Sequence, residues 1–191
     1  MEKLIFFSHN KSKIKEILES FKKTKIKILT LNDFPNTDVP EENGISFEEN
    51  AKIKSEFGYN HFGLPCFADD SGICIDALNN LPGIKSNRFQ KENGGYEKTF
   101  KLIIDKAKVT KKFNAYFKTV ISLTTDISTI YFSGSISGKI SASPLGSLGF
   151  GYDPIFIPRG SIKTFAQMTS VEKNKLSHRS AAIKKLKNFL K

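Results

Sequence analysis

Two adjacent carboxylates stand beside a strongly apolar run in the first half of the chain. Asp69 and Asp70 follow the apolar residues 65–68 and precede Ser71-Gly72. We expect the run to be a buried strand with the acids at its end, where two neighbouring charges are costly unless something compensates them. A bound Mg²⁺ would do so, because it prefers carboxylate oxygens and keeps waters for phosphate ligands. The alternative is a turn with exposed acids, and the apolar run favours the metal site.

A second candidate is the turn that follows the first apolar segment. Ser8, Asn10, Lys11 and Lys13 lie between a strand predicted at residues 3–8 and the start of a helix. Backbone N–H groups at a helix N-terminus attract phosphate, and a lysine adds charge. The turn lacks the glycine-rich Walker A pattern. By itself it is also explained by a capped helix with a solvated lysine face.

The glycine-rich loop at residues 146–154 contains Phe150-Gly151-Tyr152-Asp153. An aromatic ring in such a loop stacks on a nucleobase, and a carboxylate reads the edge of the base. The alternative is a core aromatic beside a turn.

Three basic side chains surround the start of the last predicted helix: Lys173, His178 and Arg179. Cations beside a helix N-terminus are electrostatically unfavourable, and an anion bound between them removes the conflict. Arginine makes bidentate contacts with phosphate, and lysine supplies a point charge. A structural histidine in the core is the competing interpretation.

The elements that position these residues follow from hydrophobic periodicity and capping patterns. The chain opens with a strand, a helix whose apolar stripe begins at Ile14, and a second strand ending near Leu31, which indicates an α/β fold. Further along we expect helices from the capping box at Ser46 to about Tyr59 and around residues 96–104, a long strand at 113–123 with a hairpin partner at 129–140, a second capping box at Thr169, and a last helix after Ser177.

Composition narrows the function classes. The chain has 191 residues and a formal net charge of +11, which favours an anionic partner such as a nucleotide or nucleic acid, although scattered lysines are also an ordinary solvated surface. Cys66 and Cys74 match no metal spacing and are expected to be reduced core thiols in a cytoplasmic protein. No apolar stretch is long enough for a transmembrane helix.

Taken in order, these segments resemble the inosine triphosphatase-like family, the dITP/XTP pyrophosphatases. The resemblance extends from Lys3 to the last helix and rests on six pieces of sequence. These are Ser8 to Lys13, Ser46 to Ala51, Phe67 to Gly72, Leu81 to Ile84, Gly149 to Pro154, and Glu172 to Arg179.

The resemblance implies one domain over residues 1–191 with two lobes, a long mixed twisted sheet flanked by helices, and a central substrate cleft. It implies Mg²⁺-dependent hydrolysis of ITP, dITP and XTP to the monophosphate and pyrophosphate, in a homodimer with no membrane and no specific nucleic-acid partner. Asp70 would be the general base and a metal ligand with Glu41, although Glu42 stays open because the loop aligns loosely. Substrate contacts would come from Ser8, His9, Asn10, Lys11, Ser12, Lys13, Lys54, Ser71, Phe150, Gly151, Tyr152, Asp153, Lys173, His178 and Arg179.

The chain departs from the family pattern at three places. Ser8-His9-Asn10 stands where the family usually has Thr-Gly-Asn, which changes how closely the backbone approaches phosphate. Asn79-Asn80 stands where a glycine pair is common, and asparagine tolerates the left-handed backbone that such a turn needs. The region from Gln90 to Tyr96 is shortened. Two alternatives remain: a pyrophosphatase for pyrimidine or methylated nucleotides, and a basic nucleic-acid-binding protein.

Overall fold

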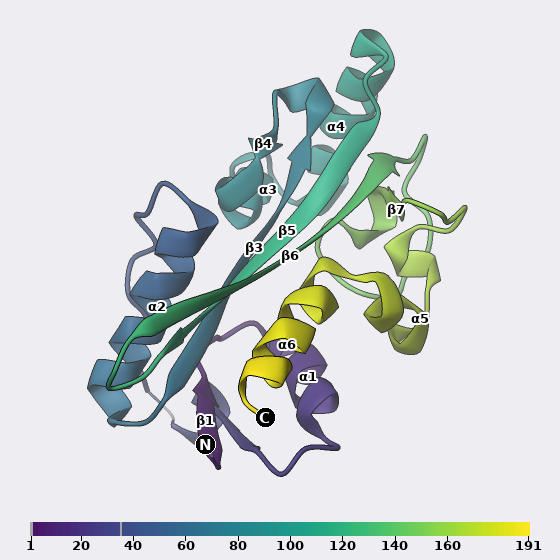
Figure 1. Ribbon diagram of the computed structural model, residues 1–191. Helices are drawn as coiled ribbons and strands as arrows, with labels where there is room; N and C mark the ends of the chain where they lie inside the picture. The colour runs from purple at the N-terminus through teal and green to yellow at the C-terminus, as the bar shows by residue number, and fades with distance from the viewer. Residues whose placement is uncertain (1, 35) are drawn as a thin grey trace. The chain divides into compact units, whose positions relative to one another are not determined.

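The computed structural model describes residues 2–34 and 36–191, and its chain divides into two compact units (Figure 1). Unit 1 comprises residues 1–70, 119–133 and 182–191, and unit 2 comprises residues 71–118 and 134–181. Three strands contribute residues to both units, so each unit is built from several separate stretches of chain.

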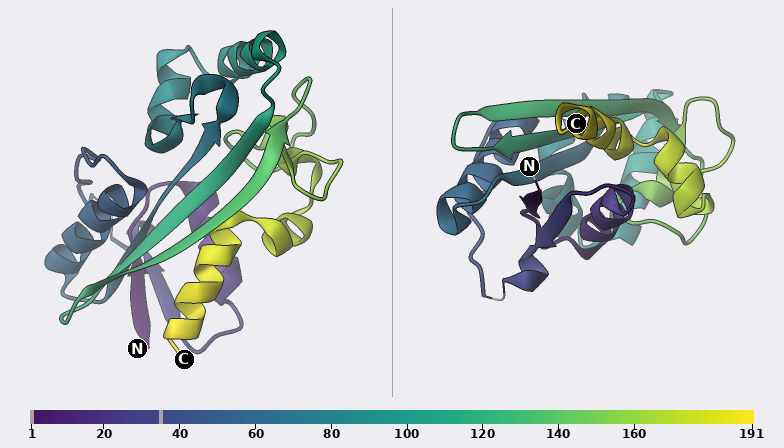
Figure 2. Two further views of the ribbon diagram at one scale, coloured as in Figure 1. Left: turned by 45° about the horizontal axis from the view of Figure 1, so that its top comes forward. Right: turned by 60° about the horizontal axis from the view of Figure 1, so that its bottom comes forward.

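The strands form one mixed sheet in the order β2-β1-β3-β5-β6-β7, with β4 paired to β3. Strands β1, β2 and β3 pair in parallel, whereas β4 and β7 pair antiparallel with their neighbours. The fold is α/β, as predicted, and β5 and β6 form a long hairpin that is seen in every ribbon view (Figure 2). The bounds are β1 Lys3–Phe6, β2 Lys27–Thr30, β3 Cys66–Ile75, β4 Leu81–Pro82, β5 Asn114–Thr124, β6 Thr129–Ile140 and β7 Phe156–Pro158.

In unit 1, helices cover both faces of the strands. Side chains alternate along β3, so Phe67 joins one core cluster while Cys66 and Ala68 join another. The first cluster packs against α1 (Lys11–Phe21) and α6 (His178–Phe189), and residues of α2 (Phe47–Phe62) pack against the second. Burial on both faces explains why residues 66–68 and 73–75 of β3 are apolar without alternation.

Unit 2 has its own core, built mainly on α4 (Tyr96–Thr110). Its buried face carries Phe100, Ile103 and Ala107, which pack with apolar residues of β3, β5 and β6 and with Tyr152 and Phe165. The remaining helices are α3 (Ser86–Glu92) and α5 (Ser170–Leu176), of which the sequence predicted only α5. This core carries the loop that contains Phe150 and the start of α6.

Several local predictions are confirmed and two are wrong. Asn79 and Asn80 have φ values of 53° and 65°, so both adopt the left-handed conformation. The capping box at Thr169 is complete, but the one at Ser46 is only half formed, because the carboxylate of Glu49 accepts from Ile45 N instead of Ser46 N. The acids Asp69 and Asp70 lie in the middle of β3 and not at the end of a strand, because β3 continues through Gly72 to Ile75.

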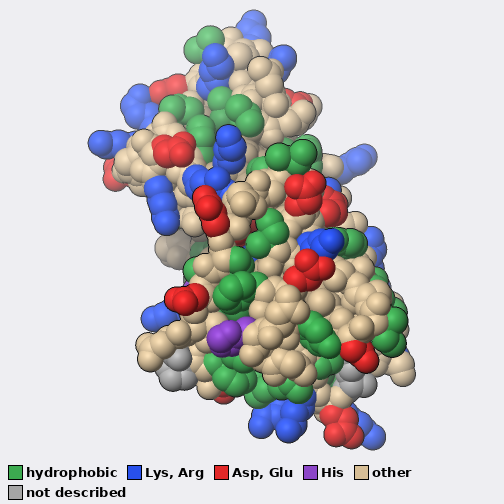
Figure 3. All heavy atoms as spheres, turned by 90° about the vertical axis from the view of Figure 1, so that its left-hand side faces the viewer, with side chains coloured by type: hydrophobic (Ala, Val, Ile, Leu, Met, Phe, Trp, Pro, Cys, Tyr) green, Lys and Arg blue, Asp and Glu red, His purple; other side chains and the backbone are tan. Residues whose placement is uncertain are grey.

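The two cysteines lie in the core, as predicted. Cys66 and Cys74 are free and buried, and burial raises the pKa of the Cys66 thiol. Within residues 2–34 and 36–191, no helix is long and apolar enough to cross a membrane. Lysine and arginine side chains are distributed over the face in Figure 3, with acidic side chains among them.

Candidate active site

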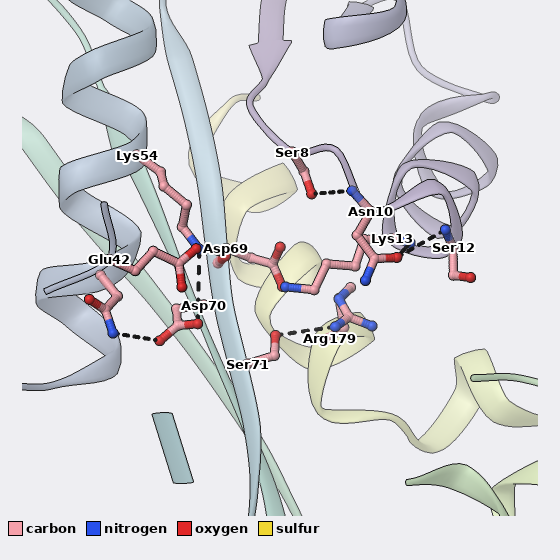
Figure 4. Close-up of polar contacts among 11 residues, drawn as sticks. Ser8, Asn10, Ser12, Lys13, Glu42, Lys54, Asp69, Asp70, Ser71 and Arg179 are labelled. Carbon is pink, nitrogen blue, oxygen red and sulfur yellow. Dashed lines mark hydrogen bonds and ion pairs between the residues drawn. The ribbon is translucent and has the colours of Figure 1, made fainter. Parts of the chain in front are cut away.

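The two acids of β3 project to opposite faces of the sheet because successive strand residues alternate. The Asp69 side chain is fully buried, and its Oδ2 lies 3.0 Å from Lys13 Nζ on α1 (Figure 4). The Asp70 side chain is 7% exposed and faces Lys54 on α2. Each acid is therefore held by a lysine from a different helix, Asp69 by Lys13 and Asp70 by Lys54, and all four residues belong to unit 1.

The first turn of α1 is organised by Asn10. Its Oδ1 accepts hydrogen bonds from Ser12 N at 3.0 Å and Lys13 N at 3.1 Å, and its own N–H donates to Ser8 Oγ. This is an ordinary N-cap, which satisfies helix donors that lack partners in the helix. His9 and Lys11 are exposed at the same turn, and His9 does not have a positive φ, so this backbone does not itself require glycine there.

Lys54 connects three carbonyl or carboxylate groups. Its Nζ lies 2.8 Å from Glu42 Oε1, 2.8 Å from the main-chain oxygen of Asp69 and 3.9 Å from Asp70 Oδ1. The lysine side chain is only 11% exposed, so these charges interact with little screening by solvent. Lys54 thus links the loop before α2 to the centre of β3.

The Asp70 carboxyl has a perturbed acidity. Its pKa is raised from 3.8 to about 6, mainly by burial, with Lys54 and Lys13 opposing the shift and Glu42 and Asp69 adding to it. A carboxyl with a pKa near neutrality accepts a proton more readily than an ordinary aspartate. A buried, perturbed acid of this kind is also a common mark of a functional site.

Asn50 lies in the segment Ser46 to Ala51 and was not among the predicted site residues. It is fully buried on α2, and its Nδ2 lies 3.3 Å from Asp70 Oδ2 while its Oδ1 accepts from Gly44 N at 2.9 Å. The available signal was its position, because Asn50 shares a helical face with the buried Phe47 and Ala51. A polar residue in an apolar stripe needs a buried partner.

The acids of unit 1 can hold a divalent metal ion. Glu42 and Asp70 lie on either side of the same ammonium group, whereas the side chain of Glu41 is exposed. Among the residues that the structure describes, no three His, Cys, Asp or Glu side chains are grouped to hold a metal by themselves. This arrangement fits Mg²⁺, which takes one or two carboxylates from a protein and completes its shell with water and phosphate.

In unit 2, the predicted residues gather around Phe150, which is partly exposed. Asp153 is buried, and its Oδ2 accepts from Lys173 Nζ at 2.6 Å and from Phe150 N at 2.9 Å. The ammonium of Lys173 lies 4.6 Å from the centre of the Phe150 ring, within cation–π distance. Asp153 therefore holds the loop and the lysine under one face of the ring.

Unlike Phe150, Tyr152 is a buried core residue. It is 4% exposed and packs with Tyr96 and Phe100 in the core of unit 2. Its hydroxyl donates to Ser86 O at 2.7 Å, and burial raises the pKa of this phenol. Gly151, between the two aromatics, has a φ of 64°, which lets one ring point inward and the other stay accessible.

The start of α6 places two basic residues in the same unit. His178 is 4% exposed and stacks on Phe117 with ring centres 4.6 Å apart. Arg179 donates to Ser71 Oγ at 3.2 Å, and its guanidinium carbon lies 5.5 Å from the centre of the Phe150 ring. Unit 2 thus combines one accessible aromatic ring with two cations and a serine.

The predicted residues therefore form two sets. Unit 1 holds the turn from Ser8 to Lys13 with Lys54, Asp69 and Asp70, and unit 2 holds Ser71 with the residues around Phe150. Asp70 and Ser71 are neighbours in β3, so the two sets are joined covalently at adjacent residues of one strand.

Comparisons with known proteins agree on one family. The sequence profile of the Ham1 family matches residues 4–189. The dITP/XTP pyrophosphatase of Christiangramia forsetii is 38% identical over 188 residues, which are 98% of each chain, and that of Porphyromonas gingivalis is 38% identical over 100% of this chain and 98% of its own. Two solved structures are also similar: the Staphylococcus aureus Ham1 protein (TM-score 0.86, 37% identity, 98% and 97% covered) and a HAM1 protein from Coxiella burnetii (TM-score 0.89, 34% identity, 100% and 98% covered).

Proposed function

Because the chain belongs to the Ham1 family, we propose that it is a nucleoside triphosphate pyrophosphatase that hydrolyses the noncanonical purine nucleotides ITP, dITP and XTP. The products are the nucleoside monophosphate and pyrophosphate. The observation that carries the proposal is the buried Asp70 carboxyl, whose pKa is raised to about 6 beside Lys54. Relatives named dITP/XTP pyrophosphatases support the choice of substrate.

Asp70 is the general base of the proposed reaction. A water oxygen attacks the α-phosphorus, the bond from that phosphorus to the bridging oxygen breaks, and pyrophosphate leaves with the electron pair. The water proton passes to the Asp70 carboxylate and then to solvent. Phosphoryl transfer otherwise needs mainly positioning and charge neutralisation, which Lys13, Lys54 and the N-terminus of α1 supply to the phosphates.

A divalent metal, Mg²⁺, would be held by Asp70 and by an acid of the preceding loop. Its chemistry here is to neutralise charge on the phosphates. Of the two acids that the sequence left open, Glu42 is favoured, because Glu42 contacts Lys54 at 2.8 Å while Glu41 is exposed. A homodimer and a cytoplasmic location, which the family implies, stay predictions.

The unit 2 set would select the base. Phe150 offers a ring face for a purine, and Arg179 and Lys173 lie close to that ring. A purine with a 6-oxo group presents a hydrogen-bond acceptor where adenine presents a donor. A hydrogen-bond donor such as His178 would therefore favour binding of ITP over ATP. Among the alternatives, a pyrimidine substrate would cover less of the Phe150 ring.

The nucleic-acid alternative rests on the net charge of +11. Binding to nucleic acid gives no reason for a buried Asp70, and on the face in Figure 3 acidic side chains lie among the basic ones. The interspersed charges are an ordinary solvated surface.

A substrate panel tests the proposal. The protein is incubated with Mg²⁺ and ITP, dITP, XTP, GTP, ATP, dUTP or a methylated nucleotide, and pyrophosphate release is measured. We expect ITP, dITP and XTP to be hydrolysed with kcat/KM values about 100-fold or more above that for ATP, because the site's buried polar groups mismatch the adenine edge. Turnover centred on dUTP or methylated nucleotides, or salt-dependent DNA binding without hydrolysis, would refute it.

A further inference from the structure

Asn50 occupies a place in unit 1 that joins two parts of the proposed site. Its side chain is fully buried on α2 and contacts both the Asp70 carboxylate and the main chain of the acidic loop. Buried amides are costly unless their donors and acceptors are satisfied. A specific polar partner on each side is therefore the reason that this apolar helix face tolerates an asparagine.

The two contacts fix the orientation of the amide. A donor has to face the Asp70 carboxylate, and an acceptor has to face the Gly44 N–H, so rotating the amide by half a turn would lose both bonds. The amide nitrogen Nδ2 of Asn50 then donates to Asp70 Oδ2 at 3.3 Å, while Asp70 Oδ1 is the oxygen on the side of Lys54. Contacts at both oxygens restrict rotation of the carboxylate.

The other side of Asn50 restrains the loop that carries Glu42. Gly44 lies so close that a Cβ added there would be 2.8 Å from Asn50 Oδ1 and 2.7 Å from Glu49 Cβ. Ile45 N also donates to Glu49 Oε2 at 2.9 Å. The loop between Glu42 and α2 is thus tied to the first turn of the helix by two adjacent side chains.

We propose that Asn50 is a positioning residue for the hydrolysis, which sets the rotation of the Asp70 carboxylate and ties it to the loop that carries Glu42. The inference rests on the proposed function. A neutral amide suits this role. A cationic side chain at the same place would compete with a metal ion for the Asp70 carboxylate, and an acidic side chain would repel that carboxylate. Neighbours of this kind hold reacting groups in the productive geometry.

Two substitutions separate the two contacts. Asn50→Leu keeps the branched shape and removes both bonds. Asn50→Asp keeps an acceptor for Gly44 N–H and places a second carboxylate against Asp70. We expect both variants to lower kcat for ITP by about 10- to 100-fold, since a small misplacement of a reacting group costs this much, while KM changes by less than about threefold. The phosphate contacts of Lys13 and the α1 turn remain in both.

Ser46→Ala is the matched control. Ser46 caps the same helix four residues earlier by accepting from Glu49 N, and it does not touch Asp70. This variant loses a helix cap and lowers the melting temperature, but we expect kcat within about twofold of the wild-type value, because the amide bridge is intact. A general weakening of α2 would instead lower kcat alike in all three variants.

Amide hydrogen exchange at Gly44 gives a readout that does not depend on turnover. Protection of this N–H should be lost in Asn50→Leu and kept in Asn50→Asp. If both Asn50 variants keep wild-type kcat, or if Gly44 stays protected in Asn50→Leu, the inference is wrong. If the wild-type protein hydrolyses no triphosphate, the proposed function fails instead, and the exchange pattern still tests whether Asn50 ties the loop.

Discussion

Two buried acids, Asp153 in unit 2 and Asp70 in unit 1, differ in how close a lysine comes to them. In unit 2, Asp153 is committed to Lys173 at 2.6 Å, and both side chains are about 95% buried. In unit 1, Asp70 meets its lysine at 3.9 Å, and that lysine also contacts Glu42 and the main chain of Asp69 at 2.8 Å. Asp153 thus forms a close ion pair with Lys173, whereas Asp70 lies farther from Lys54, which makes shorter contacts with two other groups.

The difference between the two acids suggests that unit 1 carries the residues for hydrolysis and unit 2 those that recognise the nucleobase. Asp153 is held in a close ion pair, whereas Asp70 without a bound metal ion has a pKa of about 6 and so accepts a proton more readily than an ordinary aspartate. The pair of Asp153 and Lys173 instead fixes the loop that presents Phe150. Changes in unit 1 should therefore act mainly on kcat, and changes in unit 2 on stability, KM and the choice of base.

Replacing Asp70 should have the largest effect on turnover. Asp70→Asn keeps the size of the side chain but removes the base, so we expect kcat to fall by about 1,000-fold or more. Pyrophosphate release under saturating ITP and Mg²⁺ measures the loss. Asp76→Asn, just beyond the end of β3, is the control and should keep wild-type turnover. Turnover of Asp70→Asn close to that of the control would remove Asp70 from the chemistry.

Breaking the pair of Asp153 and Lys173 should mainly destabilise the protein. Asp153→Asn leaves an acceptor for Phe150 N–H but strands the buried Lys173 ammonium, which costs about 3–5 kcal/mol. Urea denaturation measures this change. The surface pair of Lys101 and Asp105 has a comparable N–O distance of 2.8 Å, with side chains 80% and 53% exposed. Asp105→Asn should therefore leave stability unchanged within error, and equal losses in the two variants would contradict this account.

The raised pKa of Asp70 makes stability depend on pH in a defined direction. The folded-state pKa of about 6 lies above the ordinary value of 3.8 for an aspartate, so between these values the folded protein binds more protons than the unfolded chain. Stability therefore falls as the pH rises through this window, by about 3 kcal/mol in total. Urea denaturation of wild type and Asp70→Asn in EDTA at pH 4 and pH 7 should show the variant gaining about 2 kcal/mol, which is most of this amount, relative to wild type. A difference that is the same at both pH values would refute the shift.

The smallest expected effect concerns the accessible ring of unit 2. Phe150→Leu keeps an apolar side chain but loses the aromatic face, so KM for ITP should rise about 10-fold, since stacking on a base is worth about 1–3 kcal/mol. The value of kcat should change little, because Asp70 and Lys54 are untouched. Steady-state kinetics measure both constants, with Phe150→Tyr as the variant that keeps stacking. A loss confined to kcat would place Phe150 in the chemistry.

Much of the fold could be predicted from periodicity. The strand predicted at residues 129–140 matches β6, and the last helix predicted after Ser177 is α6, which buries Ala182, Ile183 and Leu186. The location of Asp69 and Asp70 within β3 was missed, because a strand covered on both faces shows no alternation that reveals where it ends.

The site could be predicted in part. Residue types and the family resemblance identified Lys13, Lys54 and Asp70, but the sequence could not show which of Glu41 and Glu42 turns toward Lys54. Nor could it show that Tyr152 is committed to the core by its bond to Ser86 O. The helical face that Asn50 shares with Phe47 and Ala51 indicated burial, but the sequence could not show its two partners, because they lie on other segments of the chain.

Hydrolysis in ¹⁸O-labelled water tests most directly whether the water that Asp70 activates attacks the α-phosphorus. A single turnover of ITP with Mg²⁺ is run in labelled water, and both products are analysed by mass spectrometry. We predict one ¹⁸O atom in inosine monophosphate and none in pyrophosphate. Label in pyrophosphate would mean attack at the β-phosphorus and would contradict the mechanism.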